Sequence, residues 1–426
     1  MNKADYKIHI IGAGISGLIA ARVLEESGYH PVILESTSGA GGRVKTDYIE
    51  EYQLDHGFQV LLTAYPAAQK FLDFKTLSLQ KFLPGAVIFS KGKKKVIGDP
   101  TRDLSLLIPT LLANIGSLSD KLKILKLNSI LKKKSIHEIF SQKEKTTLTY
   151  LKDFGFSTEI IQQFFKPFFS GIFLEPHLDT SSRMFEFVYK MFGEGYATLP
   201  KSGIAAIPDQ LLSKLNHTSF QYNTSVQKVE DGRIILENGK EIQSHFTIIA
   251  TEPGLVMPKL KNQEVEWKSC DTLYFETDTR NISKPLIGLI TDPESLINNI
   301  CYHTSLKTNS NPKKELLSVT IVKEHNLNES TLVARVKTEL QQYCNIQTKR
   351  FIKRFLIRRA LPNITNLQYE MLPTETKLTT TVFLAGDQLL NGSLNAAMIA
   401  GEKAALGVIG TLEDGLIVEE FTSEFN

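Results

Sequence analysis

Residues near the amino terminus have the types and spacing of a phosphate-binding turn. A G-x-G-x-x-G pattern there contains Gly12, Gly14, Ile15, Ser16 and Gly17. In such a turn the first glycine permits a tight bend, the second lets the backbone approach a pyrophosphate, and the third lets a helix pack on a strand. Glu35 follows eighteen positions after Gly17, where a carboxylate can accept hydrogen bonds from both hydroxyls of an adenosine ribose. Because this carboxylate would repel a 2′-phosphate, the pattern favours a dinucleotide without one.

The flanking segments supply the elements that this turn needs. Residues 6–11 form a short run typical of a buried parallel strand, and residues 30–35 have the same character. Between them, apolar residues recur at helical spacing from Leu18 to Leu24, and Gly28 ends the predicted helix. A strand, a glycine turn, a helix and a second strand therefore follow in the required order, with the amino terminus of the helix facing the phosphates.

A second glycine-rich turn, Gly39-Ala40-Gly41-Gly42-Arg43, follows the acid directly. An arginine there suits a second anionic portion of a long dinucleotide. The order G-A-G-I-S-G-L, L-E and G-A-G-G-R resembles the amino-terminal signature of FAD enzymes in the flavin-containing amine oxidase and phytoene desaturase superfamily. The resemblance implies that FAD is the cofactor and that its oxidised ring accepts a hydride at N5.

Segments further along the chain resemble the same superfamily. Residues 54–59 correspond to its D-x-G segment beside the flavin ring, and residues 196–212 to the stretch that leads back into the nucleotide domain. Val226 stands where a valine backbone touches adenine, and residues 381–398 resemble the carboxy-terminal F-A-G-D and S-x-x-G-A segment. The resemblance thus implies these cofactor-binding residues: Gly12, Gly14, Ile15, Ser16, Gly17, Glu35, Gly42, Arg43, Gly57, Val226, Gly386, Asp387, Ser393 and Leu394.

The carboxy-terminal segment also departs from the superfamily. Ala396 stands where the relatives have glycine, and Asn395 where they often have glutamate. Residues 389–394 contain neither an aromatic residue of the amine oxidase cage nor the cysteine that tethers the flavin in some relatives, which implies noncovalent FAD. The sequence has no second G-x-G-x-x-G and no C-x-x-C, so oxygen or a quinone is the expected electron acceptor.

These segments predict an α/β fold in which a Rossmann-like FAD/NAD(P)-binding domain carries an inserted α+β substrate domain. The predicted FAD-binding domain is discontinuous and comprises residues 1–75, 200–258 and 378–426. The intervening residues 76–199 and 259–377 are predicted to form the substrate-binding domain.

Residues 164–192 are dense in aromatic side chains, which favours either a hydrophobic core or an apolar tunnel for an extended lipid-like substrate. The leading hypothesis is desaturation or oxidation of an apolar, carotenoid- or isoprenoid-like molecule, in the manner of phytoene desaturases. Oxidation of an amine is the second hypothesis, and a flavin-binding, membrane-associated protein without turnover is the third. Catalytic residues are not assigned: Lys268 and His56 are candidates, but a surface position is the favoured explanation for the lysine and a structural role for the histidine.

Composition sets broader limits. The 426 residues allow two or three domains, and a net charge of +3 gives no overall field for nucleic-acid binding. Cys270, Cys301 and Cys344 are too far apart for a metal site and favour a reducing compartment. The first residues do not resemble a secretory signal and no apolar run reaches the length of a spanning helix, so a cytoplasmic location is expected.

Residues 91–134 contain eleven basic and three acidic residues, a local net charge of +8. Within this segment, leucines and isoleucines recur at helical spacing from Leu104 to Leu118, and Ser119-Asp120 is predicted to cap a second helix. Apolar helices bordered by lysines are attracted to anionic membranes, so peripheral membrane contact is one interpretation. An ordinary solvated run of charges is the other.

Overall fold

The computed structural model describes residues 2–90, 92–113, 115–258, 260, 265–310 and 312–413. Within the predicted domain segments, some positions lie outside the described residues: 1, 91, 114, 259, 261–264, 311 and 414–426. Two of these positions, 91 and 114, belong to the predicted basic segment 91–134.

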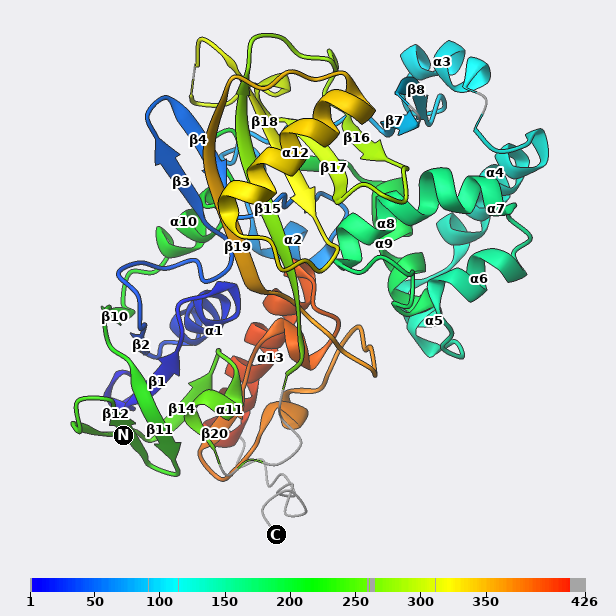
Figure 1. The fold of residues 1–426 in the computed structure, drawn as a ribbon. Coiled ribbons are helices and arrows are strands. Elements are labelled where there is room, and N and C mark those ends of the chain that lie inside the picture. Colours follow the sequence, from blue (N-terminus) through cyan, green and yellow to red (C-terminus); the bar gives the residue numbers. More distant parts are fainter. Residues whose placement is uncertain are drawn as a thin grey trace.

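A five-stranded parallel sheet forms the first half of the molecule (Figure 1). Its order is β10-β2-β1-β14-β20, with Ile10 of the central strand between Ile33 and Ile248. All four residues of the central strand are buried, as expected for a parallel strand covered on both faces. The strands are β1 (Ile8–Ile11), β2 (Val32–Leu34), β10 (Ser219–Gln221), β14 (Phe246–Ile249) and β20 (Val382–Leu384).

Different elements cover the two faces of this sheet. The helices α1 (Ile15–Glu26) and α13 (Leu394–Glu413) pack against each other and bury Ile10 and Ile248. The next residues along those strands, Ile11 and Ile249, pack under a three-stranded meander on the opposite face. The meander contains β11 (Val226–Glu230), β12 (Arg233–Leu236) and β13 (Glu241–Gln243).

The predicted α/β fold is therefore confirmed, and the sheet draws its strands from three separated segments of the chain. The helices α10 (Ala206–Leu212), which packs on α1, and α11 (Pro253–Val256) belong to the same half. Two small sheets connect it to the rest. They contain β3 (Thr46–Ile49) with β4 (Tyr52–Asp55), and β5 (Leu61–Leu62) with β9 (Ala197–Leu199) and β6 (Gln80–Lys81).

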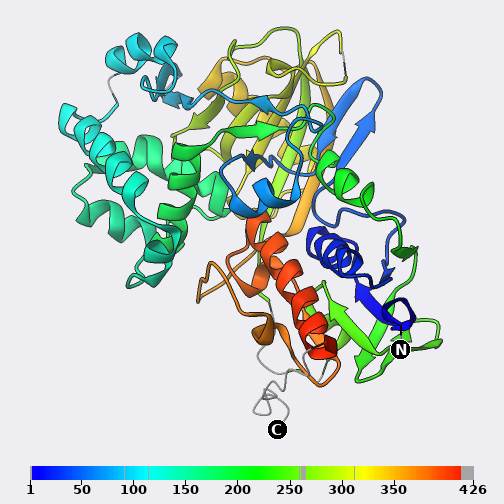
Figure 2. The same cartoon turned by 180° about the vertical axis from the view of Figure 1, so that it is seen from behind.

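A seven-stranded mixed sheet forms the second half, and Figure 2 shows it from behind. Its order is β19-β15-β18-β17-β16-β7-β8. The strands are β7 (Gly85–Ser90), β8 (Lys93–Gly98), β15 (Trp267–Thr277), β16 (Ile287–Ile290), β17 (Ile297–Tyr302), β18 (Glu315–Ile321) and β19 (Arg350–Pro362).

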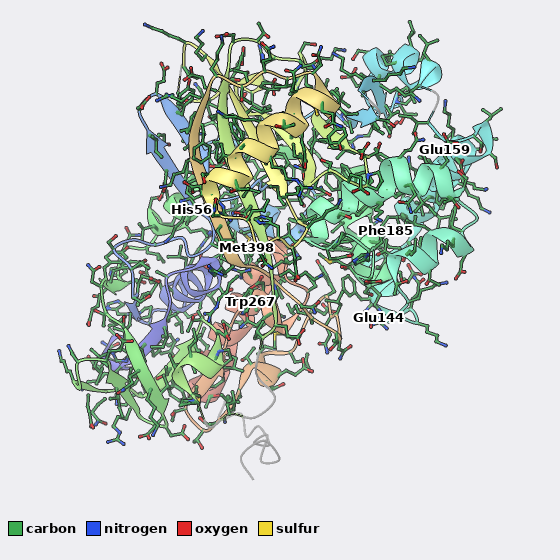
Figure 3. All side chains as sticks on the ribbon, viewed as in Figure 1. His56, Glu144, Glu159, Phe185, Trp267 and Met398 are labelled. Atoms are coloured by element: carbon green, nitrogen blue, oxygen red, sulfur yellow. The ribbon has the colours of Figure 1, made fainter. Side chains whose placement is uncertain are left out.

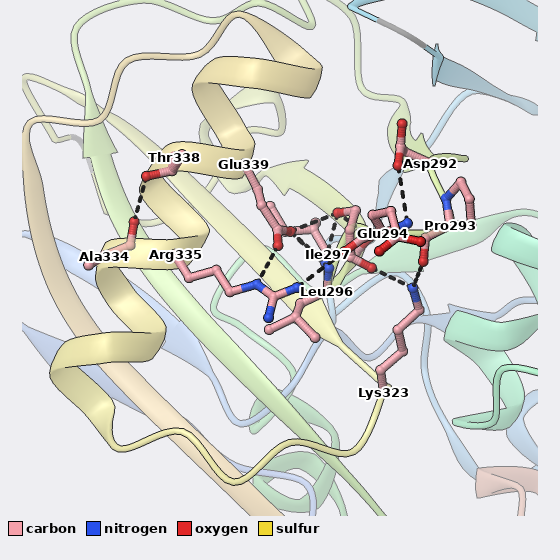
Figure 4. A network of polar contacts seen from close by, with 11 residues as sticks. Asp292, Pro293, Glu294, Leu296, Ile297, Lys323, Ala334, Arg335, Thr338 and Glu339 are labelled. Atoms are coloured by element: carbon pink, nitrogen blue, oxygen red, sulfur yellow. Dashed lines mark hydrogen bonds and ion pairs between the residues drawn. The ribbon is translucent and has the colours of Figure 1, made fainter.

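The helix α12 (Glu329–Cys344) covers one face of this sheet through a stripe of Leu332, Val336 and Leu340. Its buried Glu339 accepts hydrogen bonds from Ser295 Oγ and the Leu296 backbone N–H at 2.8 Å, and from Arg335 Nε on the same helix (Figure 4). The carboxylate thus satisfies backbone groups that would otherwise be unpaired at the start of β17.

A helical cluster lies at the end of the seven-stranded sheet, far from the parallel sheet (Figures 1 and 2). Its core includes Phe165, Phe169, Phe173 and Phe185, all fully buried. The helices in this part of the chain are α3 (Leu107–Leu112), α4 (Leu118–Lys133), α5 (Ile136–Ser141), α6 (Thr147–Asp153), α7 (Thr158–Ile160), α8 (Lys166–Phe173) and α9 (Ser182–Glu194). The helix α2 (Pro66–Phe71) instead packs on α13.

The helix boundaries predicted for the basic segment were wrong. The first helix ends at Leu112, and Ser117 rather than Ser119 caps α4. The Ser117 side chain accepts from the Asp120 backbone N–H, while the Asp120 carboxylate accepts from the Ser117 N–H at 2.8 Å. This reciprocal pair is a capping box, in which the acid stands three residues after the cap rather than beside it.

Candidate functional site

A cavity of about 1640 Å³ runs from the carboxyl ends of the parallel strands, between the two halves, to the helical cluster. Its wall contains thirteen of the fourteen residues that the sequence predicted for cofactor binding. They are Gly12, Gly14, Ile15, Ser16, Glu35, Gly42, Arg43, Gly57, Val226, Gly386, Asp387, Ser393 and Leu394. Gly17 is not among the residues that line this cavity. Segments far apart in the chain therefore meet at one site, and their contact with a cofactor stays a prediction.

The first glycine turn has the shape that a pyrophosphate requires. Gly12 has a φ of +103°, and Gly14 occupies the N-cap of α1, where no side chain caps the helix. The first N–H groups of α1 therefore lack a side-chain acceptor, and they can bind an anion. A Cβ on Gly14 would have only the Gly42 Cα at 4.0 Å nearby, whereas one on Gly17 would lie 2.1 Å from the Gly12 carbonyl oxygen. Gly17 thus serves helix packing, in keeping with its place outside the cavity wall.

Glu35 directly follows β2 and is buried beside this turn. Its Oε2 accepts from the Ala13 N–H at 2.8 Å, and its Oε1 accepts from the Thr37 N–H and hydroxyl at 2.8 and 2.7 Å. These bonds fix the carboxylate at the cavity wall. Oε2 accepts only the Ala13 bond among the described contacts and can accept a further hydrogen bond, so this oxygen suits a ribose hydroxyl.

Arg43 crosses the cavity from the second glycine turn. Its guanidinium forms an ion pair with Asp387, which follows β20, and lies 5.1 Å from the centre of the Trp267 ring. Gly42 precedes it with a φ of +60°, and a Cβ there would lie 3.1 Å from the Gly14 Cα. The two glycine turns therefore touch, and the short contact and positive φ favour glycine at position 42.

The D-x-G segment joins the site to the chain that returns from the substrate domain. Asp55 is buried, and its Oδ1 accepts from Thr46 Oγ1 at 2.6 Å and from the Ile204 N–H at 3.0 Å. Burial raises the pKa of this carboxyl to about 6, because the charged form loses its hydration. Two residues later, Gly57 lines the cavity with a φ of +87°.

The start of α13 closes the site. Ser393 Oγ accepts from the Ala396 N–H at 3.0 Å and donates to Asn391 Oδ1 at 2.6 Å, so this hydroxyl caps the helix. Asn395, which departs from the superfamily, is fully buried, and its Oδ1 accepts from the Ala67 N–H of α2 at 2.9 Å. Asn395 therefore holds α2 rather than lining the cavity.

Sequence reasoning missed Trp267. The tryptophan lines the cavity and donates from Nε1 to Glu252 Oε2 at 3.1 Å, whereas the neighbouring Lys268 donates to Thr180 Oγ1 at 3.2 Å and lies outside the wall. Successive side chains of a strand point to opposite faces, so only one of these neighbours can face the site. The sequence shows that Trp267 is the chain's single tryptophan, which could have drawn attention to it. It does not show the pairing of β15 with β19 that turns this side chain toward the site.

His56 lines the cavity as well. Its Nε2 lies 2.8 Å from Asp47 Oδ1, and its ring is 4.3 Å from the Phe355 ring on β19. Figure 3 shows His56, Met398 and Trp267 along the junction between the two halves. The Asp47 contact holds the imidazole in place, and the histidine thus has a structural role that needs no catalysis.

The outer part of the cavity is an apolar arm that extends through the helical cluster. Members of the predicted aromatic stretch divide between two places: Phe165 and Phe185 belong to the core, while other members line the arm. Aromatic residues along the arm are Phe58, Phe82, Phe164, Phe168, Phe169, Tyr189, Phe192 and Tyr196. At its far end the arm reaches Leu118, Leu122 and Leu125 of α4.

Comparison with known proteins identifies the family. The model of flavin-containing amine oxidoreductases matches residues 15–409. The chain belongs to this family. The family's flavin confirms the predicted cofactor class, and the glycine turns, the open start of α1 and Glu35 fit an adenine dinucleotide such as FAD.

Relatives within the flavin-containing amine oxidoreductase family are distant. A flavin-containing amine oxidase of Danio rerio is 54% identical over 46 residues, which are 11% of this chain and 9% of that protein. A putative protoporphyrinogen oxidase from Exiguobacterium sp. 255-15 has a TM-score of 0.70 at 16% identity, over 95% of this chain and 98% of that one. Putrescine oxidase bound to putrescine has a TM-score of 0.69 at 14% identity, over 95% and 99%. The chain thus spans about a tenth of that curated relative, and the solved structures show the fold.

In the described part of the chain, no group of histidines, cysteines and acids could hold a metal ion. The three cysteines are buried and unpaired. None of the described helices combines the length and apolarity needed to cross a bilayer.

Proposed function

We propose that the protein is a FAD-dependent oxidoreductase that desaturates or oxidises an extended apolar substrate, of carotenoid or isoprenoid character. The observation that carries this proposal is the aromatic and aliphatic lining of the arm between the flavin site and α4. Apolar walls bind an apolar chain by burying its surface and exclude water from the reacting bond. FAD would supply the hydride acceptor at the inner end of the arm.

The charges along the arm support the same proposal. Outside the nucleotide-binding half, Asp99 is the acid that lines the described cavity, and its carboxylate accepts from the Thr101 N–H and hydroxyl at 2.9 and 2.6 Å. Arg102 and Lys121 line the same region. An ammonium substrate would meet more positive than negative charge there, which disfavours its binding.

We also propose that FAD is held noncovalently, as residues 389–394 contain no cysteine. Cys270 lines the cavity, but burial raises the pKa of its thiol to about 12. A thiol that keeps its proton is a poor nucleophile toward the flavin. Release of all FAD into the supernatant after acid precipitation is the expected result, and retention in the pellet would contradict it.

Amine oxidation is the second candidate, because amine oxidases are among the relatives. Whether the substrate is apolar or an amine, oxygen or a quinone would accept the electrons from the flavin. We further propose a cytoplasmic location, which the three unpaired cysteines favour.

Anaerobic bleaching of the flavin decides between these candidates. The FAD-loaded protein is mixed with polyenes and isoprenoids in detergent, and separately with a panel of amines. Bleaching by the polyenes or isoprenoids alone supports the proposal. Bleaching by amines, with hydrogen peroxide released in air, would favour the second candidate, and a flavin that no substrate bleaches would favour a binding protein without turnover.

A further inference from the structure

Large hydrophobic side chains exposed to solvent gather on one part of the molecule. Thirteen such side chains are exposed among the described residues, and eight of them lie between positions 104 and 130. Leu104 and Leu112 are 81% and 78% exposed, and Leu118 is 75% exposed. We call these eight the leucine face: Leu104, Leu107, Ile108, Leu112, Leu118, Leu122, Leu125 and Ile130. An apolar cluster of this extent marks an interaction site.

Helical spacing aligns the members of the leucine face. Ile108 and Leu112 are four residues apart in α3, Leu104 lies four residues earlier in the preceding 3₁₀ turn, and Leu118, Leu122 and Leu125 share one side of α4. The opposite side of α4 packs inward through Leu127 and Leu131. Figures 1 and 2 place α3 and α4 at the outer edge of the molecule, away from the parallel sheet.

Basic residues are dense in the segment that carries the leucine face. Between positions 92 and 134 the described chain has nine lysines and one arginine, and three aspartates. Lys126, Lys132 and Lys133 are exposed on α4 itself. All three acids have local partners: Asp99 accepts from Thr101, Asp103 accepts from the Ser105 N–H in the 3₁₀ turn before α3, and buried Asp120 accepts from Ser117 and Ser157.

The composition of this surface decides which partner it fits. Protein interfaces are enriched in aromatic residues, methionine and arginine and depleted in lysine. The leucine face contains only leucine and isoleucine, and most charged residues of the segment that carries it are lysines. Aliphatic side chains bordered by lysines suit a bilayer, where the former enter the acyl boundary and the latter meet anionic headgroups.

We propose that the leucine face docks the protein on an anionic lipid bilayer, with the mouth of the cavity against the membrane. Leu118, Leu122 and Leu125 belong to both surfaces: they are exposed, and they line the outer end of the apolar arm. An apolar substrate can therefore pass between the bilayer and the arm without crossing water. This docking does not depend on the identity of the substrate.

Vesicle sedimentation of the FAD-loaded protein tests the docking. We expect binding to vesicles of phosphatidylcholine and phosphatidylglycerol at 3:1, and at least tenfold weaker binding when NaCl rises from 50 to 500 mM. Leu122→Glu should weaken binding at least tenfold. Leu372→Glu is the matched control, because Leu372 is exposed to a similar degree, 63% against 59%, on a different surface. Absence of wild-type binding at 50 mM NaCl would overturn the proposal.

Two further measurements distinguish other occupants. Leu122→Trp should show a blue-shifted emission quenched by brominated lipids, and Leu372→Trp should not; equal quenching of both would overturn the proposed orientation. Sedimentation velocity without vesicles tests for a second copy of the chain. If the wild type is a dimer and Leu122→Glu is a monomer, the leucine face is a self-association surface, and the proposed docking on lipid is overturned. All these results are read without turnover, so a failed activity assay leaves them unaffected.

Discussion

Arg43 and Asp387 form an ion pair between the second glycine turn and the residue that follows β20. The two residues are 344 positions apart, and both line the cavity at the ends of parallel strands. The side chain of Asp387 is only 5% exposed, so its negative charge is balanced chiefly by this guanidinium. Arg43 also donates to the Ala360 carbonyl oxygen of β19 at 3.3 Å, which links the two halves at the flavin site.

Arg43→Lys should weaken FAD binding by about tenfold to a hundredfold. A lysine keeps the charge but loses the planar fork that can contact Asp387, Ala360 and a dinucleotide phosphate together, and charge-assisted hydrogen bonds are worth about 1.5–3 kcal/mol each. Titration of apoprotein with FAD, followed by flavin fluorescence, gives the affinity. Arg22→Lys is the control, because Arg22 contacts Glu26 and Phe71 outside the cavity. Unchanged affinity in Arg43→Lys would contradict a cofactor role.

Gly401→Ala should destabilise the protein by about 1–3 kcal/mol, the usual range for overpacking. A Cβ on Gly401 of α13 would lie 2.2 Å from the Ser16 carbonyl oxygen of α1, so the two helices would have to separate. Gly193→Ala is the matched control in α9, where a Cβ meets no atom within 4 Å. The control should be neutral or slightly stabilising, since alanine favours helix over glycine. Urea unfolding measures both, and equal effects would refute the packing argument.

The sequence predicted the nucleotide-binding half well because its signals are local. The glycines of residues 12–17, the acid at Glu35 and the turns of the meander each specify a short backbone conformation. Such patterns do not depend on distant contacts. The structure accordingly places the predicted residues on one cavity wall, and Gly17 takes the packing role that its motif position implies.

The substrate half was less predictable because long-range pairing builds it. Trp267 faces the site only because β15 and β19 pair in a particular register, interrupted between Lys268 and Cys270. A shift of one residue would have exposed Lys268 to the cavity instead. Likewise, the apolar periodicity of residues 104–118 showed a helical face but not whether that face is buried or exposed.

Asp99→Asn distinguishes the two substrate classes. Asparagine keeps an oxygen to accept from the Thr101 N–H and hydroxyl, so the loop should remain folded. With an apolar substrate we expect kcat/KM to stay within about threefold of the wild type, because such a substrate has no charge that would lose its partner. A loss of tenfold or more toward an amine would assign Asp99 to ammonium binding, because a hydrogen bond to a charged group contributes about 1.5–3 kcal/mol and about 1.4 kcal/mol corresponds to a tenfold change.

The stability of the Asp55→Asn variant relative to wild type should increase as the pH rises. Burial raises the pKa of Asp55 from 3.8 to about 6, so between these values the folded protein binds more protons than the unfolded chain, and wild-type stability falls with rising pH. Asparagine cannot ionise, and its Oδ1 can still accept from Thr46 and Ile204. The variant should therefore gain about 2 kcal/mol relative to wild type between pH 4 and 7.5, measured by urea unfolding. Asp73→Asn should change in the opposite direction, because hydrogen bonds from the Thr76 and Lys75 N–H groups lower the pKa of Asp73. A stability difference between Asp55→Asn and wild type that is the same at both pH values would contradict a raised pKa.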